Sequence, residues 1–213
     1  KPYGIPLIAA GRTPLQTILV DYVGLENFAY HLYDYAAEVA ELYDALLTGF
    51  RRQVELIAGG PGRFVSVLEN FTAETMGPVR FAQYHLPVYK ELFPVLQQSG
   101  KIVGTHYDGK LACCKDLIAS APIDLIESLT PPPEGDLTLD QCRAAWPEKL
   151  FWVNINVSNY DLPPQELKEL VAKLVSQGAP EGRRLAFEVS EQYPHNWKES
   201  MPVVLEALNE IEL

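Results

Sequence analysis

Cysteine is scarce in this sequence, with three among 213 residues. Cys113 and Cys114 are neighbours that cannot easily bridge each other, and Cys142 makes the number odd, so no framework of disulfide bonds is expected. Proteins without such a framework are typical of reducing compartments, and we expect a cytoplasmic protein.

Positive charge and long apolar runs are also scarce. The chain has 17 Lys and Arg against 28 Asp and Glu, which gives a formal net charge of -11. Nucleic-acid binders and proteins of anionic membrane surfaces carry basic patches instead. No apolar run approaches the ~20 residues that cross a bilayer. We therefore expect neither nucleic acid nor a membrane as a partner, and a small-molecule substrate instead.

Short motifs of several enzyme classes are missing as well. The sequence has no G-x-S-x-G nucleophile turn, no G-x-x-x-x-G-K-[ST] phosphate loop and no C-x-x-C pair. The glycine-rich stretch Gly59–Gly62 precedes an apolar run instead of opening a helix, which predicts a turn. Reactive groups are therefore expected at scattered positions of the sequence.

Six short apolar runs are present, and amphipathic helical stretches lie between them. The runs are Ile5–Ala10, Phe64–Leu68, Ile102–Thr105, Ile123–Leu129, Leu150–Ile155 and Leu185–Val189. Apart from the fourth, which contains acidic residues, they lack the polar alternation of strands with one wet face. This pattern predicts βα units around a parallel sheet, an α/β fold.

The helical stretches are predicted from apolar residues at helical spacing and from glycine stops. We expect helices at Leu25–Ala58, Gly77–Gln98, Leu111–Ala119, Thr138–Ala145, Pro164–Gln177 and Trp197–Glu210. Leu25–Ala58 is expected to be one long outer helix. The proline cluster Pro131–Asp136 could be read as a linker, but a strand is predicted before it and a helix after it. It is therefore expected to be a stiff loop at the mouth of a barrel.

Six βα units are two fewer than a (β/α)8 TIM barrel contains, and such barrels need ~250 residues or more. The chain starts at Lys1 and enters a predicted strand within five residues. We expect the missing strands upstream of Lys1. On this interpretation residues 1–213 form a single barrel domain with about the last six βα units.

Polar residues follow these apolar runs, and the carboxyl ends of parallel barrel strands converge on one mouth. The polar positions are Glu69-Asn70, His106 to Gly109, Glu127, Asn154 with Asn156, and Glu188 with Glu191. They can therefore surround one ligand. This shared position is the main functional signal of the sequence.

His106 and Asp108 are two residues apart, so both point the same way and Tyr107 the opposite way if the strand continues. With Glu188 or Glu69 from another strand they form a candidate N/O ligand set for a divalent metal such as zinc, which could activate a thiol or water. The alternative is a hydrogen-bonded histidine and an Asp108 that caps the helix near Leu111.

Candidate catalytic residues are Glu127 and Glu69. Each is either a buried acid with a raised pKa, suited to proton transfer, or the first residue of a loop. Asn154 and Asn156 are expected to bind polar groups of a substrate, and Asn70 and Tyr107 to position it.

Several stretches resemble the uroporphyrinogen decarboxylase superfamily, in the order expected for its last six βα units. They are Met76–Phe81 with Leu86–Lys90, Ile102–Gly109, Ile123–Asp136 and Pro194–Trp197. The Ile123–Asp136 stretch resembles a less characterised branch of that superfamily. The resemblance implies a (β/α)8 barrel with its site at the mouth.

This superfamily contains two chemistries. Its decarboxylases remove carboxylates from a tetrapyrrole without a cofactor, and its methyltransferases use zinc to move a methyl group from a corrinoid to a thiol. The zinc ligands of the methyltransferases resemble His-x-Cys after one strand and a further Cys after the last. His106 matches that His, and Asp108 stands at the first Cys position. Glu188 or Ser190 lies near the second. The resemblance therefore does not support a thiolate-rich zinc site, and an oxygen-rich site stays open.

We expect an enzyme, and three functions stay open. The first is metal-assisted methyl transfer on a small substrate, with a corrinoid or corrinoid protein as partner. The second is cofactor-free decarboxylation of a tetrapyrrole such as uroporphyrinogen. The third is a non-catalytic barrel that binds a small molecule.

Overall fold

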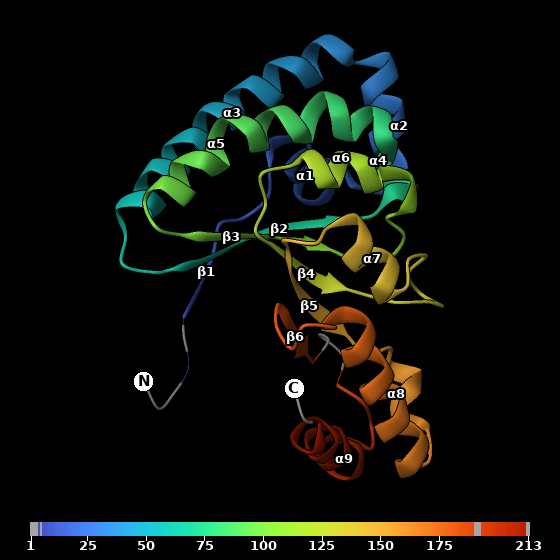
Figure 1. Ribbon diagram of the computed structural model, residues 1–213. Coiled ribbons are helices and arrows are strands. Elements are labelled where there is room, and N and C mark those ends of the chain that lie inside the picture. The colour runs from blue at the N-terminus through green and yellow to red at the C-terminus, as the bar shows by residue number, and fades with distance from the viewer. Residues whose placement is uncertain (1–3, 5, 190–192, 212–213) are drawn as a thin grey trace.

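A computed structural model describes residues 4, 6–189 and 193–211. Its six strands form one parallel sheet whose spatial order equals their order along the chain (Figure 1). The strands are β1 (Leu7–Ala9), β2 (Phe64–Phe71), β3 (Ile102–Tyr107), β4 (Leu125–Leu129), β5 (Leu150–Asn154) and β6 (Leu185–Glu188). The predicted α/β class and the six predicted strands are confirmed, although Ile5 lies outside the described residues.

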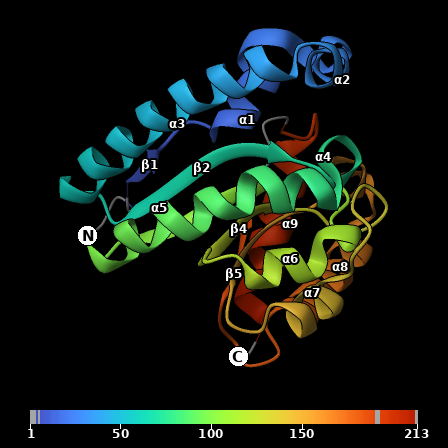
Figure 2. The ribbon, with the colours of Figure 1, turned by 90° about the horizontal axis from the view of Figure 1, so that it is seen from above.

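At least one helix separates each strand from the next, and the helices wrap around one side of the curved sheet (Figure 2). They are α1 (Pro14–Thr17), α2 (Gly24–Asp34), α3 (Ala36–Gly59), α4 (Ala73–Arg80), α5 (Leu86–Gln98), α6 (Lys115–Ser120), α7 (Leu139–Ala145), α8 (Pro164–Gly178) and α9 (Trp197–Glu210). This arrangement is a partial α/β barrel. Within the described ranges, no helix is both long and apolar enough to cross a membrane.

The predicted single helix over Leu25–Ala58 is wrong, because the chain leaves helical geometry at Tyr35. The two resulting helices pack on different neighbours. α2 packs on the π-helical turn Ile18–Val23, whereas α3 packs on α1 and α5. No glycine or proline marks the break, since tertiary packing sets it.

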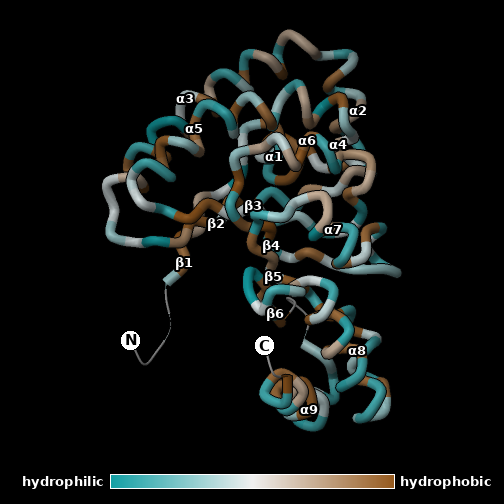
Figure 3. The backbone as a smooth tube through the Cα atoms, viewed as in Figure 1, coloured by the Kyte–Doolittle hydropathy of each residue, from teal (hydrophilic) through white to brown (hydrophobic). Residues whose placement is uncertain are grey.

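The strands are mostly apolar, as Figure 3 shows by their brown colour, and the inner strands β2 to β5 are largely buried. In β2, Val65 and Val67 are fully buried beneath the helices. Successive side chains of a strand point to opposite faces, so Leu68 and Asn70 point into the barrel and Glu69 points to the helices. This alternation decides which polar groups reach the mouth.

The proline-rich loop is held against the mouth. The Asp136 carboxylate accepts the backbone N–H groups of Leu111 (2.7 Å) and Ala112 (3.0 Å). A Cβ atom on Gly135 would lie 1.9 Å from the backbone oxygen of Thr130, so only glycine fits this close approach. The stiff loop predicted for Pro131–Asp136 is therefore present. The cap near Leu111, which the sequence offered as a role for Asp108, is made by Asp136.

Candidate functional site

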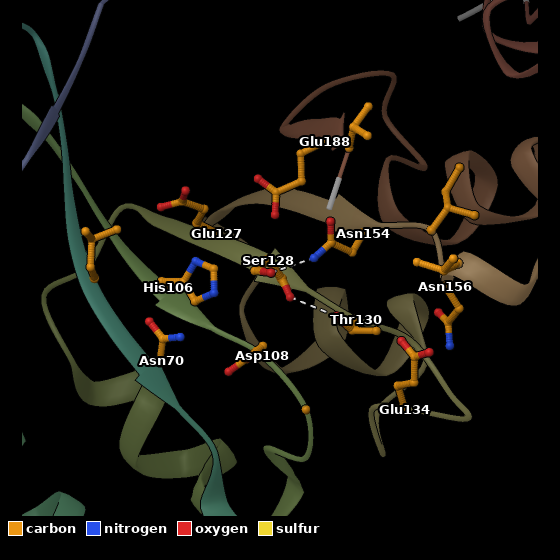
Figure 4. Close-up of a pocket in the computed structure, with 15 residues that line it drawn as sticks. Asn70, His106, Asp108, Glu127, Ser128, Thr130, Glu134, Asn154, Asn156 and Glu188 are labelled. Atoms are coloured by element: carbon orange, nitrogen blue, oxygen red, sulfur yellow. Dashed lines mark hydrogen bonds between the residues drawn. The ribbon is translucent and has the colours of Figure 1, made fainter. Parts of the chain in front are cut away.

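A cavity of about 490 Å³ opens at the carboxyl ends of the strands (Figure 4). Side chains from β2 to β6 and from the loops that follow them line it. They are Leu68, Asn70, His106, Asp108, Gly109, Glu127, Ser128, Thr130, Glu134, Asn154, Ile155, Asn156, Val157, Glu188 and Val189. The lining contains four carboxylates and neither Lys nor Arg. Its charge is therefore strongly negative.

Seven of the nine predicted site residues lie together here. These are Asn70, His106, Asp108, Glu127, Asn154, Asn156 and Glu188. The strand register explains the grouping. His106 of β3 stands opposite Glu127 of β4, and Asn154 of β5 stands opposite Glu188 of β6. Residues more than 100 positions apart thus meet because each ends a neighbouring strand.

Figure 4 shows the Glu188 side chain pointing toward Glu127, whose own carboxylate is turned toward β2. Burial, and to a smaller extent the nearby charge of Glu127, raise the pKa of Glu188 to about 7, although hydrogen bonds from Ser128 act in the opposite direction. A carboxyl group with this pKa is partly protonated at neutral pH. It can therefore give or take a proton there.

Glu127 is held by a residue two strands away. The Ser66 hydroxyl of β2 donates a hydrogen bond to the Glu127 carboxylate. On the strand between them, the residue opposite Ser66 is Gly104. A Cβ atom on Gly104 would lie 2.9 Å from Leu125 Cδ2, so the Leu125 side chain fills the space over this glycine. Glu127 is therefore a strand residue facing the cavity rather than the first residue of a loop.

Two asparagines in the cavity wall have amide atoms without a protein partner. Asn154 is 9% exposed, and its Nδ2 donates to the Ser128 hydroxyl at 2.5 Å. This bond fixes the orientation of the amide, and its Oδ1 is left buried without a partner. Asn156 is 1% exposed, and neither of its amide atoms has a partner. Buried polar atoms are usually hydrogen-bonded, so these atoms indicate a missing ligand or water.

The proposed metal ligands His106, Asp108 and Glu188 share the cavity, but they do not form a ligand cluster. Across the described part of the chain, no three His, Cys, Asp or Glu side chains converge in a way that could hold one metal ion. Ser190 and Glu191, which the sequence also suggested near this site, lie outside the described residues. The described side chains do not fit a zinc ion as they stand.

The cysteines do not supply a thiolate site either. None of them lines the cavity. Burial raises the pKa of Cys114 and of Cys142 to about 12, so both thiols stay protonated near neutral pH. These two cysteines belong to the packed core, as the apolar helix faces around them suggest.

Glu69 and Tyr107, predicted as catalytic and substrate-positioning residues, are not in the cavity. Both point to the helices and are fully buried. Glu69 accepts the Thr13 hydroxyl at 2.9 Å and the Tyr89 hydroxyl at 2.7 Å. Tyr107 donates to the Tyr89 hydroxyl at 3.1 Å. The predicted placement of these two residues at the mouth is corrected because β2 and β3 continue past Leu68 and Thr105.

Three polar residues of the cavity lining were not predicted as site residues, namely Ser128, Thr130 and Glu134. Ser66, which donates a hydrogen bond to Glu127 but does not line the cavity, was not predicted either. Ser66 had a usable signal, since it is a polar residue inside an apolar strand and shares the parity of Asn70. Ser128 has a positive φ of 64° next to a register shift in the β4–β5 pairing, which no sequence pattern announces. The Thr130 hydroxyl donates to the Ser128 backbone oxygen at 2.9 Å.

Comparison with known proteins gives a fold and no family. No family model matches the sequence, and no curated protein matches it significantly. Among solved structures, the chain is similar to a methyltransferase from Methanosarcina mazei, with a TM-score of 0.70 at 13% identity. The match covers 98% of this chain and 60% of that one. The chain thus spans well under two thirds of its neighbour, and the likeness shows the fold alone.

Proposed function

We propose that this chain forms the active-site mouth of an enzyme that transfers a methyl group to a small thiol. The observation that carries the proposal is the pair of interacting carboxyl groups, Glu127 and Glu188, in a cavity at the carboxyl ends of the strands. The similarity to a methyltransferase barrel supports the reaction class. The resemblance noted in the sequence suggests a corrinoid, free or on a partner protein, as methyl donor.

The chain's part in this reaction is to move a proton. When a thiol accepts a methyl group, the bond between the methyl carbon and the donor breaks, and its electron pair stays on the donor. A new carbon–sulfur bond forms and the thiol proton must leave. Glu188 in its ionised form takes that proton, because its pKa of about 7 lies near that of an activated thiol. Glu127 keeps Glu188 basic through the repulsion between the two charges.

Decarboxylation of uroporphyrinogen is less favoured by the same cavity. That substrate carries many carboxylates, and the described lining has four carboxylates and no cation to bind them. Like charges in a poorly solvated cavity repel strongly. The electrostatics of the described residues therefore favour a neutral or cationic substrate.

The test uses the full-length protein with methylcobalamin as donor and mercaptoethanol as acceptor, and methylated thiol is measured by mass spectrometry. We expect Glu188→Gln to lower the rate by about 10² to 10⁴, the usual contribution of a positioned acid or base. Glu148→Gln is the control, because Glu148 is an exposed partner of Arg184 outside the cavity. Absence of methylated thiol at high enzyme concentration, with mercaptoethanol and with charged thiols, would refute the proposal.

A further inference from the structure

The cavity at the mouth offers hydrogen-bond acceptors almost everywhere. Its carboxylates are Asp108, Glu127, Glu134 and Glu188. Figure 4 shows His106, Glu127 and Glu188 on one side of the cavity and Glu134 and Asn156 on the other, with Asn154 between. The first side contains the proton-transfer pair. The second side, taken together with Asn154, has a different composition, namely one carboxylate and two amides, and no role in moving the proton.

The amides of this second side indicate that a ligand binds there. The buried Oδ1 of Asn154 has no partner, and its orientation is fixed because Nδ2 donates to Ser128. An acceptor in this position is satisfied only by an N–H or O–H group of a ligand or a water. Asn156 is more deeply buried and has both amide atoms without a partner. A buried polar group without a partner is destabilising by about 1–3 kcal/mol, so a ligand that supplies one is favoured.

We propose that the second side of the cavity binds a protonated amine, and that the methyl acceptor is therefore an aminothiol whose ammonium group lies between Asn154, Asn156 and Glu134. The ammonium donates N–H groups to the unpartnered amide oxygens, and Glu134 and the other carboxylates balance its charge. Its thiol end extends toward Glu188. This inference rests on the proposed function for the identity of the thiol, whereas the amine site itself stands on the cavity.

A set of thiols of similar size separates the contributions that positive charge and N–H donors make to binding. Cysteamine carries an ammonium group, mercaptoethanol a neutral hydroxyl and mercaptopropionate a carboxylate. Thiocholine carries a positive charge without any N–H donor. We expect cysteamine to bind at least about tenfold more tightly than mercaptoethanol, because a hydrogen bond to a charged group outweighs a neutral one by roughly that factor. Mercaptopropionate is expected to bind least.

Three variants test the named residues by calorimetric titration of the full-length protein. Glu134→Gln, in an exposed loop, is expected to weaken cysteamine binding about tenfold and to leave mercaptoethanol binding unchanged. Asn154→Leu and Asn156→Leu are expected to remove the preference for cysteamine over thiocholine. Glu148→Gln, outside the cavity, is the matched control for a lost carboxylate. Thermal unfolding of each variant shows whether it folds.

The outcomes separate this inference from the proposed function. If mercaptopropionate or mercaptoethanol binds as tightly as cysteamine, or if Glu134→Gln and Glu148→Gln behave alike, the amine site is refuted. Methyl transfer to mercaptoethanol would still support the proposed function in that case. If cysteamine binds as expected but no thiol is methylated, the amine site stands and methyl transfer is refuted.

Discussion

The glutamates of β2, β4 and β6 lie on opposite sides of the sheet and have opposite surroundings. Glu69, behind the sheet, accepts hydrogen bonds from two hydroxyl groups, those of Thr13 and Tyr89. Glu127 and Glu188, in front of it, line the cavity beside two asparagines that have amide atoms without partners. The hydrogen bonds of the Glu69 carboxylate are all supplied by the protein. Around Glu127 and Glu188, buried amide atoms are left without a protein partner, as expected of a site that binds a ligand.

The group behind the sheet joins the barrel to its helices. Thr13 precedes α1, and Tyr89 lies on α5, so Glu69 ties both helices to the end of β2. His85 Nδ1 lies 3.5 Å from the Glu69 carboxylate. Burial and the charge of Glu69 raise the pKa of Tyr89 well above its usual value, which keeps the phenol a donor. This group therefore contributes stability and positions Asn70, the next residue, at the mouth.

The largest expected effect is on the pH dependence of methyl transfer, and Glu188 in the cavity causes it. Because the ionised form of Glu188 takes the proton, kcat/KM should rise about tenfold per pH unit below pH 7 and level off above it. The rate between pH 5 and pH 8 should thus differ by roughly two orders of magnitude. A flat profile for the wild type, with mercaptoethanol as acceptor, would remove Glu188 from the role of base.

Removal of Glu69 is expected to have the largest effect on folding. Glu69→Ala leaves the hydroxyl groups of Thr13 and Tyr89 buried without their acceptor. We expect a loss of about 3 kcal/mol in the free energy of unfolding, measured by urea denaturation. Glu74→Ala is the control, since Glu74 forms an exposed pair with Lys110 and should contribute under about 1 kcal/mol. Equal losses of unfolding free energy in the two variants would mean that the hydrogen bonds of Glu69 do not stabilise the fold.

Glu188→Gln is expected to stabilise the fold while it lowers activity. The folded pKa of Glu188 is about 7 against a usual 4.5, so folding favours its protonated form. Stability is then highest below pH 4.5 and falls as the pH rises to 7. The neutral glutamine avoids this loss. At pH 8 we expect a gain of about 1 kcal/mol, less than the full shift implies because Glu188 stays partly solvated. At pH 4 the gain should vanish, and a gain of equal size at both pH values would show another cause.

Strand positions could be predicted from the sequence because β-branched apolar runs such as Ile102–Thr105 have no other structural explanation. The convergence of polar residues at the mouth followed from the parallel topology alone. The side to which each residue points was harder. The expected end of β2 at Leu68 left Glu69 and Asn70 as equal candidates, whereas the strand continues to Phe71 and separates them by alternation.

Strand alternation also explains the position of Tyr107, but it does not explain the buried atoms of the site that lack partners. Continuation of β3 was expected to turn Tyr107 away from His106 and Asp108, and β3 does run to Tyr107. Burial and unpaired atoms, by contrast, depend on three-dimensional packing. The partnerless amide of Asn156 could not be predicted from the sequence, because it depends on what the loops leave empty.

The smallest expected effect is that of Tyr107→Phe, which tests whether the residues behind the sheet act independently of the cavity. Tyr107→Phe removes only the hydroxyl that donates to Tyr89 at 3.1 Å. We expect a loss of about 1 kcal/mol of stability and no change in kcat/KM for methyl transfer. Tyr89 keeps its hydrogen bond to Glu69, so the network stays largely intact. A Tyr107→Phe variant with normal stability and a tenfold lower rate would contradict this. It would support the role in substrate positioning that was expected from the sequence, because a residue behind the sheet would then affect the ligand in the cavity.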